Sequence, residues 1–389
     1  MYNILTINDI SSKGIDKFEP ENFLVDDCLK EADGILVRSA DLHNYDMPQG
    51  VLAIARAGAG TNNIPVDKCT SEGIVVFNTP GANANAVKEL VLTGMLLSSR
   101  KIFKGIEWSK TLKGQEGIEA KVEKGKKAFV GPELHGKTLG VVGLGAIGVL
   151  VANMATALGM EVVGYDPYLS VHSALKLEKG IILADTIDGV LANADYITLH
   201  LPYNKNTNQL INSEMFAKMK EGVRLLNFAR GELVDNHALK TALEDGVVYR
   251  YVTDFPCEEV LNMKNVIAMP HLGGSTPESE ENCAVMAALE IKDFLQYGII
   301  KNSINLPDCD LAFTGKPRLT LVHRNIPKMV GGVTAIIADE NLNIDNMVNK
   351  SKGDVAYTVV DLDGLSDKED ELLELLRAIP GMIKVRLIK

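Results

Sequence analysis

The N-terminal part of the chain alternates short apolar runs with polar turns, which is the pattern of a parallel sheet connected by helices. Three runs bounded by Gly, Asp or Asn predict buried strands at 34–39, 51–58 and 73–78. Residues 85–104 then repeat apolar positions every three to four residues, which predicts a long helix. This part of the chain therefore indicates an α/β fold.

A second alternating series follows the basic stretch 121–129 and begins with the run KTLGVVGLGAIG. Its later apolar runs predict further strands, at residues 161–166, 196–202, 223–229, 249–255 and 265–271. Residues 278–298 predict a second long helix. Because the two long helices bracket a complete α/β series, we expect one domain to be inserted within another.

The C-terminal part of the chain has a different order of elements. Its runs read as strand, helix, strand, strand, helix, strand, which is the order of a ferredoxin-like βαββαβ domain. A stretch typical of a linker precedes it, so we expect a separate module. The predicted boundaries are 1–94 and 276–308 for the first domain, 95–275 for the inserted domain, 309–316 for the linker and 317–389 for the C-terminal domain.

Composition narrows the class of protein. A chain of 389 residues, 46% hydrophobic and 23% charged, is typical of a globular protein of two or three domains. The formal net charge of −11 argues against a nucleic-acid partner, although a local cluster of Arg and Lys can still hold an anionic substrate. Without a signal-like leader or an apolar run of roughly 18 residues, we expect no membrane association. Five scattered cysteines without CxxC spacing predict reduced thiols in a cytoplasm and no metal site.

Three glycines in VVGLGAIG have the G-x-G-x-x-G spacing of a dinucleotide-binding turn: Gly143, Gly145 and Gly148. An apolar strand precedes them and a helical pattern follows. The first glycine would permit the tight turn, the second a close approach to pyrophosphate, and the third close packing of the helix on the strand. Asp166 ends the next strand, where a carboxylate binds ribose hydroxyls and repels a 2′-phosphate, so we expect NAD rather than NADP. The alternative is a glycine-rich turn that binds no nucleotide.

Three further polar residues follow later strands of the same series, at the edge of a parallel sheet where ligands gather. Arg230 can grip a carboxylate with two parallel hydrogen bonds. Glu258 and His271 suggest a carboxylate that orients an imidazole, which makes a competent general base near neutral pH. The alternatives are a surface arginine and a structural histidine.

Taken together, these motifs resemble the D-2-hydroxyacid dehydrogenase family, and within it the D-3-phosphoglycerate dehydrogenase branch. The resemblance rests on GLGAIG, NFARGELVD, DFPCEE and PHLGGST, on RAGAGTNNIPV and FNTPGANANAVKEL in the N-terminal part, and on a C-terminal domain similar to ACT domains. It implies an α/β fold in which a Rossmann-type nucleotide domain is inserted in a flavodoxin-like substrate domain, plus a ferredoxin-like (ACT) α+β domain. It also implies NAD-dependent oxidation of 3-phospho-D-glycerate to 3-phosphohydroxypyruvate, the first step of L-serine biosynthesis, by a homodimer or homotetramer.

The resemblance also implies roles for individual residues. His271 is the acid/base, Glu258 orients it, and Arg230 binds the substrate carboxylate and keto oxygen. The expected NAD contacts are Gly143, Gly145, Ala146, Ile147, Gly148, Asp166, Pro202, Ala229, Asp254, Gly273 and Gly274. The expected contacts of a small, phosphorylated hydroxy acid are Arg38, Arg56, Ala59, Gly60 and Asn83. Lys126 resembles a position that reaches the phosphate from a partner subunit in some members.

Two other functions stay open. One is another dehydrogenase of this family, acting on glycerate, hydroxypyruvate or D-lactate, and the other is an NAD-sensing binding protein of the same fold. A phosphorylated hydroxy acid carries about three charges, which Arg38 and Arg56 together with Arg230 can neutralise, so these arginines favour a phosphorylated substrate. The complete set of Arg230, Glu258 and His271 favours an enzyme over a sensor.

The site motifs depart from the family pattern at one strand end. The family usually reads Asp-Val-Phe before its glutamate, whereas this chain reads Thr253-Asp254-Phe255, so the aspartate stands one place later. The loop between Glu258 and His271 is also shorter than the one often found there.

The ACT-like domain raises the possibility of a bound amino acid. His323, Asn325 and Asn343 match residues that hold serine in some relatives, which makes them the candidate effector site. Lys328 stands where those relatives have a loop glycine. Because glycine lets the backbone approach a ligand, the lysine argues against serine binding at this loop.

Overall fold

The computed structural model describes residues 1–365 and 369–389, which form two compact units. Met1–Asn83 and Pro277–Lys389 form the first unit, and Ala84–Thr276 form the second. The second unit begins with the first residue of a helix, whereas the sequence placed the boundary at residue 95, inside that helix. Among the described residues, no helix is both long enough and apolar enough to cross a lipid bilayer.

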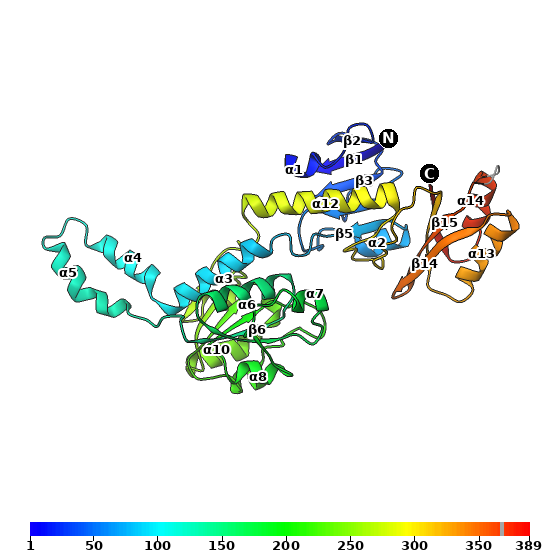
Figure 1. The fold of residues 1–389 in the computed structure, drawn as a ribbon. Coiled ribbons are helices and arrows are strands. Elements are labelled where there is room, and N and C mark those ends of the chain that lie inside the picture. The colour runs from blue at the N-terminus through cyan, green and yellow to red at the C-terminus, as the bar shows by residue number, and fades with distance from the viewer. Residues whose placement is uncertain (366–368) are drawn as a thin grey trace. The chain divides into compact units, whose positions relative to one another are not determined.

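The first unit contains a parallel five-stranded sheet in the order β2-β1-β3-β4-β5, which is the flavodoxin-like order (Figure 1). Its strands are β1 Tyr2–Ile7, β2 Phe23–Asp26, β3 Gly34–Val37, β4 Ala53–Arg56 and β5 Val75–Phe77. Its helices are α1 Ser12–Ile15, α2 Val66–Ser71 and α12 Pro277–Tyr297. On β3, Leu36 packs into a cluster with Ile291 of α12, while Ile35 packs into another with Cys69 of α2. Both faces are covered, which is why this strand is apolar throughout.

The second unit contains a parallel seven-stranded sheet in the order β12-β11-β10-β9-β6-β7-β8, which extends the Rossmann order. Its strands are β6 Thr138–Val142, β7 Glu161–Tyr165, β8 Ile182–Leu183, β9 Tyr196–Leu199, β10 Val223–Asn227, β11 Val248–Thr253 and β12 Val266–Ala268. Its helices around the sheet are α3 Ala84–Ser99, α6 Ala146–Ala157, α7 Val171–Ala174, α8 Ile187–Leu191, α9 Ser213–Ala217, α10 Asn236–Glu244 and α11 Glu258–Leu261, with the 3-10 turn η2 Gly231–Leu233. The predicted Rossmann-type domain is confirmed.

The long helix predicted at 85–104 ends earlier, and a helical arm follows it. The hydroxyls of Ser98 and Ser99 both donate to the carbonyl of Met95, which competes with the helical hydrogen bonds and helps to end α3. The arm consists of α4 Ile102–Thr111, α5 Ile118–Gly125 and the 3-10 turn η1 Lys126–Phe129. Figure 1 shows α4 and α5 as a hairpin that points away from the seven-stranded sheet. Trp108 stacks near Phe129 with ring centroids 5.3 Å apart, which fixes the turn against α4.

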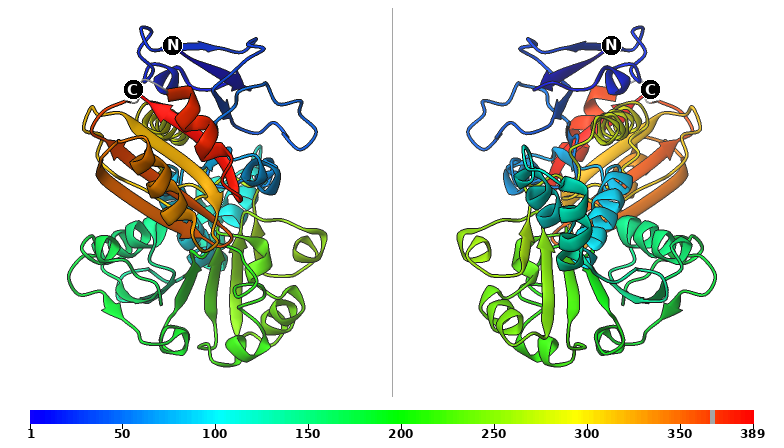
Figure 2. Two further views of the ribbon diagram at one scale, coloured as in Figure 1. Left: turned by 90° about the vertical axis from the view of Figure 1, so that its right-hand side faces the viewer. Right: turned by 90° about the vertical axis from the view of Figure 1, so that its left-hand side faces the viewer.

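The C-terminal module has the predicted βαββαβ order, so the ferredoxin-like prediction is confirmed. Its elements are β13 Arg318–Arg324, α13 Met329–Asp339, β14 Ile344–Lys352, β15 Val355–Leu362, α14 Glu369–Arg377 and β16 Met382–Ile388. The sheet is antiparallel in the order β14-β15-β13-β16. Figure 2 shows α13 and α14 on one face, where Val333 and Leu376 pack with Leu321 and Val360 of the sheet.

The other face of this sheet packs against the part of the first unit that contains the five-stranded sheet and α12, which we call the first lobe. Val322, Tyr357 and Val359 share a buried cluster with Phe294 of α12 and with Ile300. All eight residues of β15 are buried as a result. The sequence predicted a separate module beyond a linker at 309–316, whereas the structure joins it to the first lobe, because its second sheet face is also apolar.

Polar side chains of the module donate hydrogen bonds to backbone carbonyls of the lobe and of the segment that precedes the module. The donors and acceptors are Arg318 to Tyr297, Leu311 and Ala312, Arg386 to Phe294 and Leu295, Tyr357 to Gly298, Lys352 to Ser303, and Lys384 to Val51. Arg318 is fully buried and also forms an ion pair with Asp361, with 2.6 Å from Nε to Oδ1. These bonds satisfy buried donors at the interface.

Candidate active site

Six loops of the second unit leave the carboxyl ends of its parallel strands at one edge of the sheet. They follow β6, β7, β9, β10, β11 and β12 and carry Gly143, Asp166, His200, Arg230, Asp254 and His271. The strand order reverses between β6 and β9, since β7 pairs with one side of β6 and β9 with the other. Ligands of such sheets bind outside the carboxyl ends at this reversal.

The glycine loop after β6 has a distinct requirement at each glycine. Gly143 has φ +95°, and a Cβ there would lie 2.5 Å from the carbonyl oxygen of His200. A Cβ on Gly148 would lie 1.9 Å from the carbonyl oxygen of Gly143, so only glycine lets α6 pack this closely. At Gly145 a Cβ would meet nothing within 4 Å, which leaves open space before the N-terminus of α6. The loop fits a pyrophosphate there.

Asp166 lies beside this loop at the end of β7. Its Oδ2 accepts a hydrogen bond from the backbone N–H of Leu144 at 2.8 Å, and its Oδ1 accepts one from Tyr168 at 2.8 Å. Each carboxylate oxygen keeps a further acceptor site, which is what ribose hydroxyls require. Two further predicted NAD contacts, Ala146 and Ile147, lie in the first turn of α6.

Arg230 follows β10 in extended backbone and is half-buried. Its Nη1 donates to the carbonyl of Ala229 at 2.7 Å, and its Cζ lies 6.0 Å from the centre of the Phe255 ring. The amide of Asn227 donates to the carbonyl of Arg230 at 2.8 Å and to the hydroxyl of Tyr251 at 3.2 Å. The sequence did not identify Asn227 and Tyr251, because both lie inside apolar runs that read as core.

His271 follows β12, with its side chain exposed and its ring 4.7 Å from the ring of Phe255. The predicted hydrogen bond to Glu258 is not formed in the part of the chain that the structure describes. Glu258 opens the short helix α11, and its side chain is exposed. The next residue, Glu259, lines a pocket with His271 and accepts a hydrogen bond from Asn236 at 2.8 Å.

His200 is the other histidine at this edge of the sheet. Burial lowers its pKa to about 3, and its Nε2 lies 3.0 Å from the hydroxyl of Thr198. Its imidazole therefore stays neutral at physiological pH and is too weak a base to accept a proton from a substrate there. Of these two histidines, the exposed His271 is the one placed to exchange a proton.

Asp254 connects the strand before Glu258 with the loop of His271. It has no exposed surface, and its Oδ2 accepts a hydrogen bond from the backbone N–H of Gly273 at 3.0 Å. Its Oδ1 has no protein partner, and burial raises the pKa of this carboxyl. Gly273 is buried, and the next residue, Gly274, is half-buried. The displaced aspartate thus positions the histidine loop and leaves one buried oxygen atom without a protein partner.

An open pocket of about 1010 Å³ contains part of this constellation. His271, Asp254, Gly231 and Tyr251 line it, together with Glu259. Pro202 and Ala229 do not line it, although Pro202 lies exposed in the loop after β9, and Ala229 donates to the Asn227 side chain at 3.2 Å.

The predicted substrate residues lie in the first unit. Arg38 follows β3 and Arg56 ends β4, and the Nε of Arg56 donates to the carbonyl of Arg38 at 2.9 Å. The carbonyl of Ala59 accepts a hydrogen bond from Asn78 at 2.6 Å, and Gly60 is half-buried next to it. Lys126 lies in the arm of the second unit, where its ammonium pairs with Glu123 at 2.5 Å. Asn83, the last residue of this segment of the unit, has a buried Oδ1 without a hydrogen-bond partner.

The candidate effector residues do not meet within one chain. Both ring nitrogens of buried His323 have partners, the carbonyl of Arg324 and the hydroxyl of Thr358, each at 2.8 Å. Asn325 donates to Gly353 at 3.1 Å, beyond one end of β14, whereas Asn343 precedes the other end. A strand rises about 3.3 Å per residue, so these two positions are separated by the whole length of β14.

Lys328 occupies a backbone conformation that favours glycine, with φ +73° at the start of α13. A side chain in the left-handed region costs about 1–2 kcal/mol. We expect Lys328→Gly to raise the free energy of unfolding by about 1 kcal/mol, measured by chemical denaturation. Lys328→Ala removes the charge but keeps the Cβ, so equal stabilisation by both variants would contradict this explanation.

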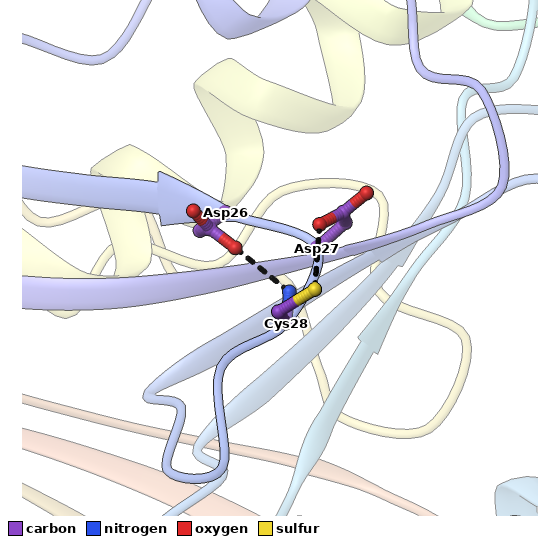
Figure 3. A group of neighbouring side chains, drawn as sticks. All are labelled: Asp26, Asp27 and Cys28. Atoms are coloured by element: carbon purple, nitrogen blue, oxygen red, sulfur yellow. Dashed lines mark hydrogen bonds between the residues drawn. The ribbon is translucent and has the colours of Figure 1, made fainter.

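A cluster of potential metal-binding side chains lies elsewhere, at the end of β2: Asp26, Asp27 and Cys28 (Figure 3). All three are exposed, and the Cys28 thiol donates to Asp27 at 3.0 Å. This hydrogen bond and the charges of the two aspartates raise the pKa of the thiol. A thiol that keeps its proton is a poor metal ligand, so this hydrogen bond disfavours Cys28 as a ligand.

Comparison with known proteins agrees with this geometry. Residues 92–273 match the family model "D-isomer specific 2-hydroxyacid dehydrogenase, NAD binding domain". A D-3-phosphoglycerate dehydrogenase of Methanocaldococcus jannaschii is 34% identical over 349 residues, which cover 86% of this chain and 62% of that protein. The D-3-phosphoglycerate dehydrogenase of Escherichia coli is 31% identical over 352 residues, which cover 87% of this chain and 82% of that protein.

A solved structure shows the same fold. The NAD⁺-bound 3-phosphoglycerate dehydrogenase of Entamoeba histolytica superposes with a TM-score of 0.60 at 29% identity, covering 78% of this chain and 98% of that one. The chain spans only 50 to 62% of the length of three curated relatives that it matches. The glycine loop, Asp166 and these matches establish NAD as the cofactor. The chain belongs to the D-isomer specific 2-hydroxyacid dehydrogenase family, which includes the D-3-phosphoglycerate dehydrogenases.

Proposed function

We propose that the chain oxidises 3-phospho-D-glycerate to 3-phosphohydroxypyruvate with NAD, the first step of L-serine biosynthesis. The observation that carries the proposal is the arrangement of Arg230 and His271 on loops at the same sheet edge as the NAD-binding glycine loop. The names of the relatives support the substrate. Arg38 and Arg56, adjacent at the ends of β3 and β4, supply charge for a phosphorylated acid.

The residues divide the chemistry between them. NAD, when bound, accepts a hydride from C2 of the substrate. His271 takes the proton of the C2 hydroxyl, since its exposed ring can reach a ligand. Arg230 binds the substrate carboxylate and polarises the developing carbonyl, because its guanidinium presents several donors in one plane. Glu258 would orient the imidazole through a hydrogen bond that the described residues do not form, and the Oδ1 of Asp254, which has no protein partner, would accept a hydrogen bond from the nicotinamide carboxamide.

Turnover tests the proposal against the two alternatives. The purified protein is incubated with NAD and 3-phosphoglycerate, glycerate or D-lactate, and NADH absorbance is followed. We expect the fastest turnover with 3-phosphoglycerate. Faster oxidation of an unphosphorylated acid would instead identify a different dehydrogenase, and NADH binding without sustained oxidation of any acid would identify an NAD-sensing protein.

The identity of the carboxylate that orients His271 has its own test. Glu258 is the residue to which the family resemblance gives the orienting role, while Glu259 is the acid that lines the pocket with His271. We expect Glu258→Gln to lower kcat about 10-fold or more, because an imidazole without an orienting carboxylate is a weaker base. Glu259→Gln is the matched control. A larger loss in that variant would transfer the orienting role to Glu259.

We propose that the arm mediates a homodimer, which can pair further into a tetramer. None of the residues of α4 and α5, all of which lie in the described part, is buried. Large apolar side chains are exposed there, with Phe103 65% and Ile106 50% accessible. Exposed apolar surface of this kind marks association sites. We expect Phe103→Asp with Ile106→Asp to yield monomers in light scattering, whereas Lys104→Asp, on the same helix, should keep the oligomer. Monomers in both variants would contradict an apolar contact.

We also propose that the protein acts in the cytoplasm. Its five cysteines are all free, and Cys69, Cys283 and Cys309 are buried. Unpaired thiols of this number are typical of a reducing compartment.

A further inference from the structure

Two arginines of the first unit lie side by side where parallel strands end. Arg56 pairs with Val37 in the sheet register, so Arg38 is its diagonal neighbour, and the Nε of Arg56 donates to the carbonyl of Arg38 at 2.9 Å. A Cβ on Gly58 would lie 3.5 Å from the Cζ of Arg56, so that guanidinium lies against bare backbone. Two guanidinium groups at the carboxyl ends of adjacent strands make an anion-binding position.

A carboxylate of the same unit already forms an ion pair with one of these guanidinium groups, that of Arg38. Glu280, in the first turn of α12, accepts a hydrogen bond from the Nη2 of Arg38 through its Oε1. The Arg38 side chain is 41% exposed and that of Glu280 40%, so both partners are accessible to solutes. An ion pair this exposed has little net stability and exchanges readily for another.

We infer that Glu280 is a specificity-determining residue, an internal carboxylate that competes with the anionic group of the substrate for Arg38. The inference rests on the proposed function, because it gives Arg38 an acidic substrate to bind. With Glu280 paired to it, Arg38 contributes no net charge to the position. A bound anion has to displace Glu280 and then lies close to a second negative charge.

The effect depends on the charge of the ligand. Coulomb repulsion scales with the product of the charges, so Glu280 opposes a phosphate of charge near −2 more strongly than a carboxylate of charge −1. It therefore weakens binding of a phosphorylated acid more than binding of glycerate. Because Glu280 acts on the anionic end of the substrate and not on C2, the change is expected in the dissociation constant and in KM more than in kcat.

The test compares Glu280→Gln with Glu281→Gln in the full-length enzyme. Glu281 is the adjacent residue and pairs with Lys13 at 2.5 Å, so its replacement changes the net charge equally without removing a partner of Arg38. We expect Glu280→Gln to lower the dissociation constant of 3-phosphoglycerate about 3- to 10-fold, measured by calorimetry, with a parallel fall in KM. Binding of glycerate should tighten less, and Glu281→Gln should leave both constants near those of the unsubstituted enzyme.

A double-mutant cycle with Arg38→Met isolates the pair. The gain from Glu280→Gln should disappear when Arg38 is absent. Equal gains in Glu280→Gln and Glu281→Gln, or a gain that persists without Arg38, would overturn the inference in favour of a general charge effect. If the unsubstituted enzyme binds 3-phosphoglycerate but does not oxidise it, the proposed function fails, while the calorimetric comparison still decides the inference about Glu280.

Discussion

Replacing His271 with asparagine is expected to lower kcat roughly 10²- to 10⁴-fold, the range lost when a general base is removed. His200 cannot replace His271 as the proton acceptor, because burial of its ring lowers its pKa to about 3 and so makes it too weak a base. Asparagine keeps a polar group of similar size at the position. Steady-state oxidation of 3-phosphoglycerate measures the loss, and NADH fluorescence shows whether the cofactor still binds.

The chain offers a matched control for this variant in the same pocket. His237, at the start of α10, is also exposed and also lines that pocket, but it follows no strand of the sheet edge. His237→Asn should therefore keep most of the activity. Comparable losses in the two variants would mean that neither imidazole is the proton acceptor and that the pocket tolerates no change.

Replacing Arg318 with methionine is expected to lower the free energy of unfolding by about 3–5 kcal/mol, the largest loss of stability that we anticipate for a single residue. Neither Arg318 nor Asp361 has exposed surface, and Asp361 accepts hydrogen bonds from Arg318 at 2.6 and 3.0 Å. The substitution leaves a carboxylate buried without its counter-charge. It also leaves the carbonyls of Leu311 and Ala312 without a donor. Chemical denaturation of the full-length chain measures the loss.

Two further variants test whether this loss comes from the unpaired charge. Adding Asp361→Leu to Arg318→Met removes the stranded carboxylate, so part of the stability should return. Recovery should be incomplete, because the carbonyls stay unsatisfied. Lys316→Met removes an exposed cation that pairs with Asp345 and should leave the denaturation midpoint almost unchanged. A double variant no more stable than the single one would show that lost packing, rather than charge, is responsible.

Much of the active-site edge was predictable because its chemistry lies in backbone geometry. The turn at Gly143 needs a positive φ and Gly148 needs close packing, and both needs follow from a strand, a glycine pattern and a helix in succession. Arg230 and His271 were predictable for a related reason. Strand ends can be located from apolar runs, and parallel strands bring their carboxyl ends together.

The partners of these residues were less accessible to sequence reasoning. Glu258 starts a helix of four residues on the surface, and no periodicity decides which way such a side chain points. Tyr251 and Asn227 lie in apolar runs, where a polar atom that contacts a loop cannot be distinguished from a core side chain. The ion pair of Glu280 with Arg38 joins residues that are far apart in the chain, so only the fold reveals it.

The packing of the C-terminal module against the first lobe could have been predicted from the apolar pattern of one of its strands. A strand that packs on one face alternates between apolar and polar residues, but β15 (VAYTVVDL) has no such alternation at its centre. A continuous apolar strand in an antiparallel sheet indicates that something covers the second face. The covering element, α12 with the segment that follows it, could not be named without the fold.

Most of the acceptors that hold this module are main-chain carbonyls, such as those of Phe294, Leu295, Leu311 and Ala312. Every amino acid supplies the same carbonyl, so these bonds do not depend on which side chains the receiving segment carries. The directional part of the recognition is therefore carried mainly by the donor side of the interface, in residues such as Arg318. The receiving segment has to keep the apolar side chains that it buries against the sheet, such as Phe294 and Ile300, but its carbonyls impose no choice of residue, so substitution should be least tolerated at the arginines and lysines of the module.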